Sequence, residues 1–145
     1  MSGGSIRHPH SQIIGLRNYD YHEDITVKNM NGWLLYEDQD IRITLSKHPI
    51  IGFFEYNLRY KPDAPVRSIA MRLQQTIRYV LDSLSKFSQS YNYFFYQLED
   101  GYEYIKVIPR YITTPLYVGY KIPQTCNDER AAKILQNITP YFALK

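Results

Sequence analysis

The chain has a single cysteine, Cys126, among its 145 residues. One cysteine excludes an internal disulfide and any Cys-x-x-Cys zinc site within the chain, and it favours a reducing compartment. No run of eighteen apolar residues is present, so no transmembrane helix is predicted, and the glycine-containing start is not typical of a signal peptide. We therefore expect a cytoplasmic protein without a membrane partner.

The chain also lacks a cluster of basic residues. Its formal net charge is +3 and its pI is about 8.9, but the lysines and arginines are spread along the sequence. Proteins that bind nucleic acids usually concentrate their positive charge in one patch or stripe. No nucleic-acid partner is therefore expected, whereas a small anionic ligand is compatible with the charge.

Hydrophobic and aromatic residues are abundant. The hydrophobic fraction of 44% in 145 residues is enough for the core of one ordinary domain. Fifteen tyrosines contribute to an aromatic content of 15%, and aromatic side chains favour strands. We interpret the tyrosines as parts of half-buried sheet faces rather than as ligand contacts.

The hydrophobic pattern predicts strands, one long helix, further strands and a short helix. An Asp-Gly pair at 100–101 indicates a hairpin turn between two strands, and an acidic turn at 37–40 joins two others. Expected strands lie at 33–36, 41–45, 54–60, 91–96, 102–110 and 116–121. Elements segregated in this way favour an α+β fold with a mostly antiparallel sheet.

Both helices are predicted from apolar spacing of three and four residues. The long helix carries this stripe at Val66, Ile69, Ala70, Leu73, Ile77, Val80, Leu81 and Leu84. Its opposite face is expected to be solvated, at Arg67, Arg72, Gln75, Arg78 and Asp82. The short helix should begin after an Asn127 cap and bury Ala131, Ile134, Leu135 and Ile138.

The first fourteen residues carry the pattern that is richest in chemistry. They contain two alternate histidines, His8 and His10, followed by Gln12. If this segment runs as a strand, the three side chains share one face, because the strand repeat is two residues. The pattern predicts an imidazole nucleophile beside other nitrogen-bearing groups.

A small, flexible turn precedes the histidines. Gly3 and Gly4 can adopt backbone conformations closed to other residues, so their N–H groups can turn toward an anion. The Ser5 hydroxyl is a further donor. Arg7 is either a solvated rim residue or a group that steers phosphate, and the residues leave both open.

The motif Ser5-x-x-His8-x-His10-x-Gln12 resembles the active site of the histidine-triad (HIT) superfamily. It is most similar to the transferase branch, the galactose-1-phosphate uridylyltransferases and the dinucleoside polyphosphate phosphorylases, where a glutamine replaces the third histidine. The resemblance implies that His10 attacks an α-phosphorus to give a nucleotidyl-histidine, while Ser5 and Gln12 contact phosphate oxygens. A nucleotide or sugar-phosphate ligand is therefore expected. The chain has Ile6-Arg7 and Ser11 where uridylyltransferases usually have Asn-Pro and Gly.

A second stretch, 102–110, resembles a degenerate copy of the HIT motif, aligned by its terminal Pro-Arg pair. Tyr102, Tyr104 and Lys106 occupy the histidine positions and share one strand face, but none is a ready phosphorus nucleophile at neutral pH. They predict either sheet packing with a solvated lysine, or a sugar-phosphate wall with Lys106 as the anion partner. Arg110 has two open interpretations, a surface charge at the strand end or a phosphate contact through the N–H donors of its guanidinium group.

The resemblance implies a protein of two HIT-like halves. Residues 1–18 would be the active-site strand of the catalytic half, and residues 19–145 the second, degenerate half. The expected fold is therefore HIT-like α+β, with a mostly antiparallel sheet, one long helix and one short helix. No cofactor is certain: some relatives bind zinc through the first histidine, so His8 would be a ligand only if the missing half supplied the others.

Two functions remain open from the sequence. The first is a nucleotidyltransferase-like activity on a nucleotide sugar or a dinucleotide, through the nucleotidyl-histidine. The second is a catalytically inactive HIT-like binding or interaction module, or a truncated product. In the second case the strand at 10–14 would be an exposed edge, which favours a homodimer.

Overall fold

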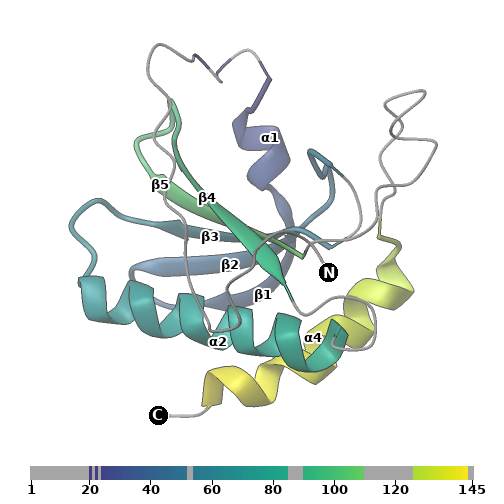
Figure 1. The fold of residues 1–145 in the computed structure, drawn as a ribbon. Coiled ribbons are helices and arrows are strands. Elements are labelled where there is room, and N and C mark those ends of the chain that lie inside the picture. Colours follow the sequence, from purple (N-terminus) through teal and green to yellow (C-terminus); the bar gives the residue numbers. More distant parts are fainter. Residues whose placement is uncertain are drawn as a thin grey trace, which may run out of the picture.

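The computed structural model describes Asp20, His22 and residues 24–51, 54–84, 90–109 and 126–143. In these parts the elements run α1 (Val27–Met30), β1 (Gly32–Glu37), β2 (Ile41–Ser46), β3 (Tyr56–Tyr60), α2 (Val66–Leu84), β4 (Tyr91–Gln97), β5 (Glu103–Pro109) and α4 (Asp128–Ala143). The strands form one antiparallel sheet in the order β1-β2-β3-β5-β4 (Figure 1). The predicted α+β class and mostly antiparallel sheet are confirmed. The predicted strand at 116–121 lies outside the described residues.

Both predicted hairpins are present, and local chemistry explains each turn. In the turn between β1 and β2, Asp38 Oδ1 accepts hydrogen bonds from the backbone N–H groups of Asp40 at 3.0 Å and Ile41 at 2.8 Å. Between β4 and β5, Gly101 has φ = 77°, a left-handed conformation that glycine adopts at little cost. The acidic residues of the first turn are therefore local hydrogen-bond acceptors.

The two sheet faces differ in cover and in chemistry. Helices α2 and α4 lie side by side against one face (Figure 1). The core between them includes Ile41, Ile43, Leu45, Tyr56, Leu58, Val80, Ile105, Val107, Ala131, Ile134 and Ile138. The other face, called the open face below, carries the intervening residues of each strand and meets the short helix α1, where Met30, Leu98 and Tyr104 form a second cluster.

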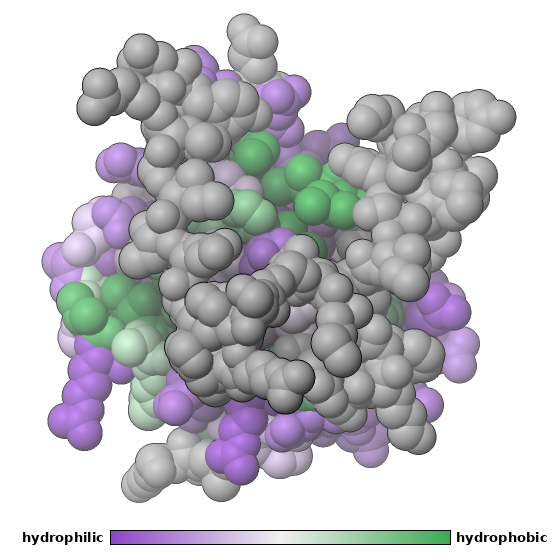
Figure 2. Space-filling model, in the orientation of Figure 1, coloured by the Kyte–Doolittle hydropathy of each residue, from purple (hydrophilic) through white to green (hydrophobic). Residues whose placement is uncertain are grey.

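Helix α4 contacts a part of α2 that was expected to be solvated. Arg72 and Gln75 were expected to be solvated, but Gln75 is buried and Arg72 Nη1 donates to the Phe142 carbonyl of α4 at 3.1 Å. Val66, expected in the core, is 80% exposed. Figure 2 shows hydrophobic surface at the left-hand end of α2 and also beside α1. The middle of the predicted stripe is confirmed, because Val80 is buried and Ile69, Leu73 and Ile77 pack against the core. The contact of α4 with Arg72 was not predicted, because the periodicity of α2 does not tell where a second helix packs.

The C-terminal helix follows its predicted cap. Asn127 Oδ1 accepts the backbone N–H of Arg130 at 2.9 Å, and Ala131, Ile134 and Ile138 are buried as expected. Leu135 is 40% exposed, so the buried stripe is narrower than predicted. Within the described residues, no helix is both long and apolar enough to cross a membrane.

Helix α1 lies in a polar stretch of the sequence without a sustained hydrophobic period. Its first turn is stabilised by Asn29, whose Oδ1 accepts the Thr26 backbone N–H at 3.0 Å. This short helix cannot be seen in hydrophobic periodicity because it spans only four residues and buries one side chain, Met30. Its position on the open face decides the geometry of the candidate site.

Candidate functional site

Most of the predicted site lies outside the described residues. This applies to the predicted catalytic and phosphate-binding residues Gly3, Gly4, Ser5, Arg7, His8, His10, Gln12 and Arg110. Lys106 is the one predicted site residue that the structure describes, on the inner strand β5. The structure therefore bears on the degenerate copy of the motif, and the roles of the opening residues stay predictions.

Strand β5 separates its side chains as the alternation predicts. Ile105 and Val107 belong to the helix-covered core, whereas Tyr104 packs with Met30 and Leu98 on the open face. Lys106 shares this open face, where its Nζ reaches the carbonyl oxygen of Asn29 in α1 at 3.0 Å. The expected common face of Tyr104 and Lys106 is confirmed.

Lys106 is not solvated, which corrects the sheet-packing interpretation. Its side chain is 0% exposed and lies 2.9 Å from Oε2 of Glu55, also 0% exposed. Glu55 is fixed in turn by the backbone N–H groups of Ile50 at 2.9 Å and Ile51 at 2.7 Å. A substrate phosphate would have to compete with Glu55 for this ammonium.

Electrostatics at Lys106 follow from its burial. Loss of hydration lowers the pKa of the Lys106 ammonium, and the neighbouring Glu55 carboxylate acts in the opposite direction. A buried ion pair of this kind is costly to break, because removing one partner leaves the other charge uncompensated. The pair links β5 to the segment that precedes β3, and Lys106 also reaches α1 through the Asn29 carbonyl.

Polar side chains next to this ion pair fasten α1 to the sheet. Thr44 Oγ1 and Asn57 Nδ2 donate to the Met30 carbonyl at 2.9 Å and 3.1 Å. Ser46 Oγ donates to the Asn29 carbonyl at 2.7 Å. These bonds satisfy carbonyls at the end of α1 that have no partner within so short a helix.

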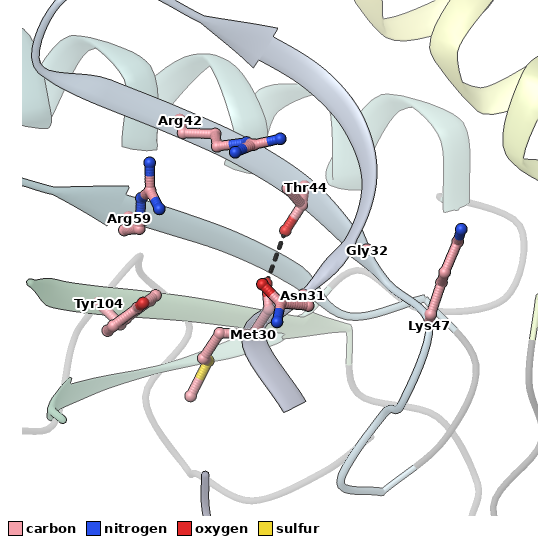
Figure 3. A pocket seen from close by; sticks show the side chains of 8 residues that line it. All are labelled: Met30, Asn31, Gly32, Arg42, Thr44, Lys47, Arg59 and Tyr104. Atoms are coloured by element: carbon pink, nitrogen blue, oxygen red, sulfur yellow. Dashed lines mark hydrogen bonds between the residues drawn. The ribbon is translucent and has the colours of Figure 1, made fainter. Parts of the chain in front are cut away.

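A cavity of about 280 Å³ opens beside α1 on the same face (Figure 3). It is lined by Met30, Asn31, Gly32, Arg42, Thr44, Lys47, Arg59 and Tyr104. Arg42 of β2 and Arg59 of β3 are opposite one another in the strand register. On the other side of β3, Tyr104 of β5 is opposite Arg59. Three of these side chains are cationic, and none of the lining residues that the structure describes is acidic.

His22 and Cys126 are the described groups with further potential for acid–base or nucleophilic chemistry. His22 Nδ1 lies 2.7 Å from Asp20 Oδ1, and this hydrogen bond raises the pKa of the exposed His22. Cys126 is buried, and burial raises the pKa of its thiol, which disfavours the thiolate nucleophile. The His22–Asp20 pair was missed because the sequence places no recognised motif around it.

Metal binding finds no support in the residues that are described. No group of three His, Cys, Asp or Glu side chains among them could hold a metal ion. The zinc ligand that the resemblance implies, His8, lies outside this part of the chain.

Comparison with known proteins identifies the family. The model of the C-terminal domain of a domain of unknown function, DUF4931, matches residues 22–142. The chain belongs to the DUF4931 family. The match covers every described strand and almost all of α4.

One solved structure extends this relationship. A DUF4931 family protein from Bacillus cereus ATCC 10987, known from a crystal structure, is 38% identical, with a TM-score of 0.75. The similarity covers 97% of this chain and 64% of that chain, so this chain spans less than two thirds of the relative's length. Comparison with curated proteins gives no match. None of these comparisons names the HIT superfamily, and that resemblance stays a prediction.

Proposed function

We propose that this chain is the second, degenerate half of a nucleotidyltransferase-like protein together with the active-site strand of the first half. The proposal depends on one observation, the spacing Ser5-x-x-His8-x-His10-x-Gln12. The substrate class is a nucleoside diphosphate sugar or a dinucleotide. His10 is the nucleophile, and the longer relative of the same family is compatible with a site shared between two halves.

The proposed reaction has two displacements at one phosphorus. A ring nitrogen of His10 attacks the α-phosphorus, forming a P–N bond while the P–O bond to the leaving phosphate breaks and its oxygen takes the electron pair. A phosphate oxygen of the acceptor then attacks the same phosphorus, and the P–N bond breaks to return the imidazole. Ser5 and Gln12 stabilise charge on the phosphoryl oxygens, and His8 orients the strand.

The degenerate copy of the motif supports His10 as the nucleophile, because its own side chains are engaged elsewhere. Lys106 is paired with Glu55 inside the protein, and Tyr104 donates its hydroxyl proton to Asp100. Burial, followed by the hydrogen bond to Asp100, raises the pKa of Tyr104. Neither side chain is therefore available as a nucleophile at neutral pH, which leaves the phosphorus chemistry to His10.

The alternative function is a non-catalytic binding module. The chemistry of β5 favours this alternative, because β5 presents no reactive group where the motif would place a histidine. In this case the 145-residue chain would bind a ligand or a partner without forming a covalent intermediate.

Covalent labelling distinguishes these functions. The intact chain is incubated with nucleoside diphosphate sugars and dinucleoside polyphosphates labelled at the α-phosphorus, and then analysed for an acid-labile phosphoramidate. We expect label on the wild type and on His48→Ala, an exposed histidine outside the motif, but none on His10→Ala. Equal labelling of His10→Ala would exclude the proposed nucleophile, and an unlabelled wild type would favour the binding module.

A further inference from the structure

Two arginines face each other on the open face of the sheet. Arg42 and Arg59 are directly opposite in the pairing of β2 with β3, and both line the cavity beside α1. Arg59 extends from β3 toward Arg42, whose side chain lies along β2 (Figure 3). Like charges at directly opposite positions of neighbouring strands are destabilising. The fold therefore retains a repulsion here that a bound anion would relieve.

The described neighbours compensate this charge only in part. Arg42 Nε lies 3.6 Å from Glu37 Oε1, and this nitrogen is buried with no hydrogen-bond acceptor. Arg59 has no acidic partner among the described ion pairs. Lys47 also lines the cavity, but its ammonium lies 5.1 Å from the centre of the Trp33 ring and apart from the two arginines (Figure 3). The two arginines are therefore the cations that an anion in this part of the cavity would meet.

Arg59 is held in position before any ligand binds. Its guanidinium carbon lies 4.3 Å from the centre of the Tyr102 ring, a cation–π arrangement that orients the planar fork without using its N–H donors. Tyr104, beside it in the cavity, is fixed by its hydrogen bond to Asp100. Side chains positioned in this way lose little conformational entropy when they bind.

We propose that this cavity binds a small molecule through a phosphate group held between Arg42 and Arg59. A phosphate group offers several acceptor oxygens to two guanidinium forks at once, whereas a carboxylate offers two oxygens and is matched by one fork. The Thr44 hydroxyl already donates to the Met30 carbonyl and accepts from Asn57 Nδ2, so recognition of the phosphate depends on the arginines. A volume of about 280 Å³ suits a small phosphate ester better than a whole nucleotide sugar.

Calorimetric titration of the full chain with inorganic phosphate and with glycerol 3-phosphate tests this site. We expect both anions to bind, acetate to bind at least about tenfold more weakly, and affinity to fall with added salt. Arg42→Gln and Arg59→Gln should each weaken phosphate binding about tenfold or more. Arg59→Lys, which keeps the charge and loses the fork, should lie between wild type and Arg59→Gln.

Control variants distinguish phosphate binding in this cavity from binding elsewhere on the protein surface. Arg78→Gln removes an exposed arginine of α2 that also pairs with a carboxylate, Asp82, at 3.9 Å, and it should bind phosphate as the wild type does. His48→Ala should do the same, because this exposed histidine does not line the cavity. Failure of the wild type to bind millimolar phosphate, or equal binding by Arg59→Gln and Arg78→Gln, would overturn the proposal. Thermal unfolding of each variant without ligand verifies that it folds.

Discussion

Lys106 Nζ lies 2.9 Å from Glu55 Oε2, and neither side chain has any exposed surface. The two residues join β5 to the segment before β3, far apart in sequence. Glu55 also accepts two backbone N–H groups, whereas Lys106 has one further partner, the Asn29 carbonyl. Beyond the ion pair itself, the Glu55 carboxylate therefore has more hydrogen-bond partners than the Lys106 ammonium.

This inequality predicts different costs for the two single substitutions. Lys106→Met leaves a buried carboxylate that keeps two N–H donors, while Glu55→Met leaves a buried ammonium with one carbonyl and also removes the acceptor for Ile50 and Ile51. We expect both to destabilise the fold, by about 3–5 kcal/mol, with Glu55→Met the more severe. Urea denaturation at neutral pH measures the difference. A double variant should be less destabilised than the sum of the singles, and additive effects would argue against a direct pair.

Substitution of Gly32 should destabilise the fold for a steric reason rather than an electrostatic one. A Cβ at this position would lie 1.7 Å from the carbonyl oxygen of Leu45, so Gly32→Ala would force β1 away from β2. We expect a loss of more than about 3 kcal/mol, beyond the usual cost of overpacking. Gly101→Ala is the matched control: its Cβ meets nothing within 4 Å, and its positive φ costs only about 1–2 kcal/mol. Similar unfolding midpoints for the two variants would contradict this prediction.

The strands and hairpins could be predicted because local signals determine them. Tyr56, Leu58 and Tyr60 alternate with polar residues, and their alternation places them in the core. The Asp100-Gly101 turn is specified by a glycine that adopts a positive φ. By contrast, the contact of Arg72 with the Phe142 carbonyl depends on how α4 packs against α2, which local periodicity does not give.

The candidate site was harder to predict because it depends on strand register. The alternation around Arg42 and around Arg59 indicates that each leaves the hydrophobic face, yet only the pairing of β2 with β3 makes them opposite one another. The sequence left Lys106 either as a solvated lysine or as an anion partner, and its pairing with Glu55 was missed because Glu55 lies fifty-one residues earlier. Hydrophobic periodicity describes neighbouring residues and does not predict contacts between residues so far apart in the sequence.

Trp33 and Asp128 predict a spectroscopic signal for the docking of α4. The indole Nε1 of Trp33 donates to Asp128 Oδ1 at 2.7 Å, and Asp128 lies in the first turn of α4. Asp128→Ala should cost about 1–2 kcal/mol, because it removes this bond and a favourable charge at the helix start. Trp33 is the sole tryptophan, so its fluorescence should change in Asp128→Ala and much less in Asp128→Asn, which keeps an acceptor oxygen. Identical spectra for wild type and Asp128→Ala would refute the contact.

His22 predicts a measurable titration. Its hydrogen bond to Asp20 is the main cause that raises the pKa of the imidazole above 6.5. Because the raised pKa belongs to the folded state, the interaction stabilises the protonated form and is lost as the pH rises through that pKa. In NMR titrations, His22 should titrate above 6.5 in the wild type and shift downward in Asp20→Asn. Assignment by a His22→Gln variant separates it from His8, His10 and His48, and an unchanged midpoint in Asp20→Asn would refute the pairing.

The buried tyrosines predict a loss of stability in alkali. Burial, then the hydrogen bond to Glu103, raises the pKa of Tyr60 from 10.0 to about 12. Between these two values the unfolded chain has released the phenol proton while the folded chain still holds it. The folded state therefore binds more protons, and the free energy of unfolding falls as the pH rises through this range.

Tyr60→Phe isolates this contribution from the other groups that titrate in the same range. Burial also raises the pKa of Tyr36, Tyr79, Tyr91, Tyr104 and Tyr141. The lowered pKa of Lys106 acts in the opposite direction, because there the unfolded state binds the extra proton. Urea denaturation across the range should show a shallower decline for Tyr60→Phe than for the wild type. Parallel curves for the two proteins would mean that Tyr60 ionises equally in the folded and unfolded states, contrary to its burial beside Glu103.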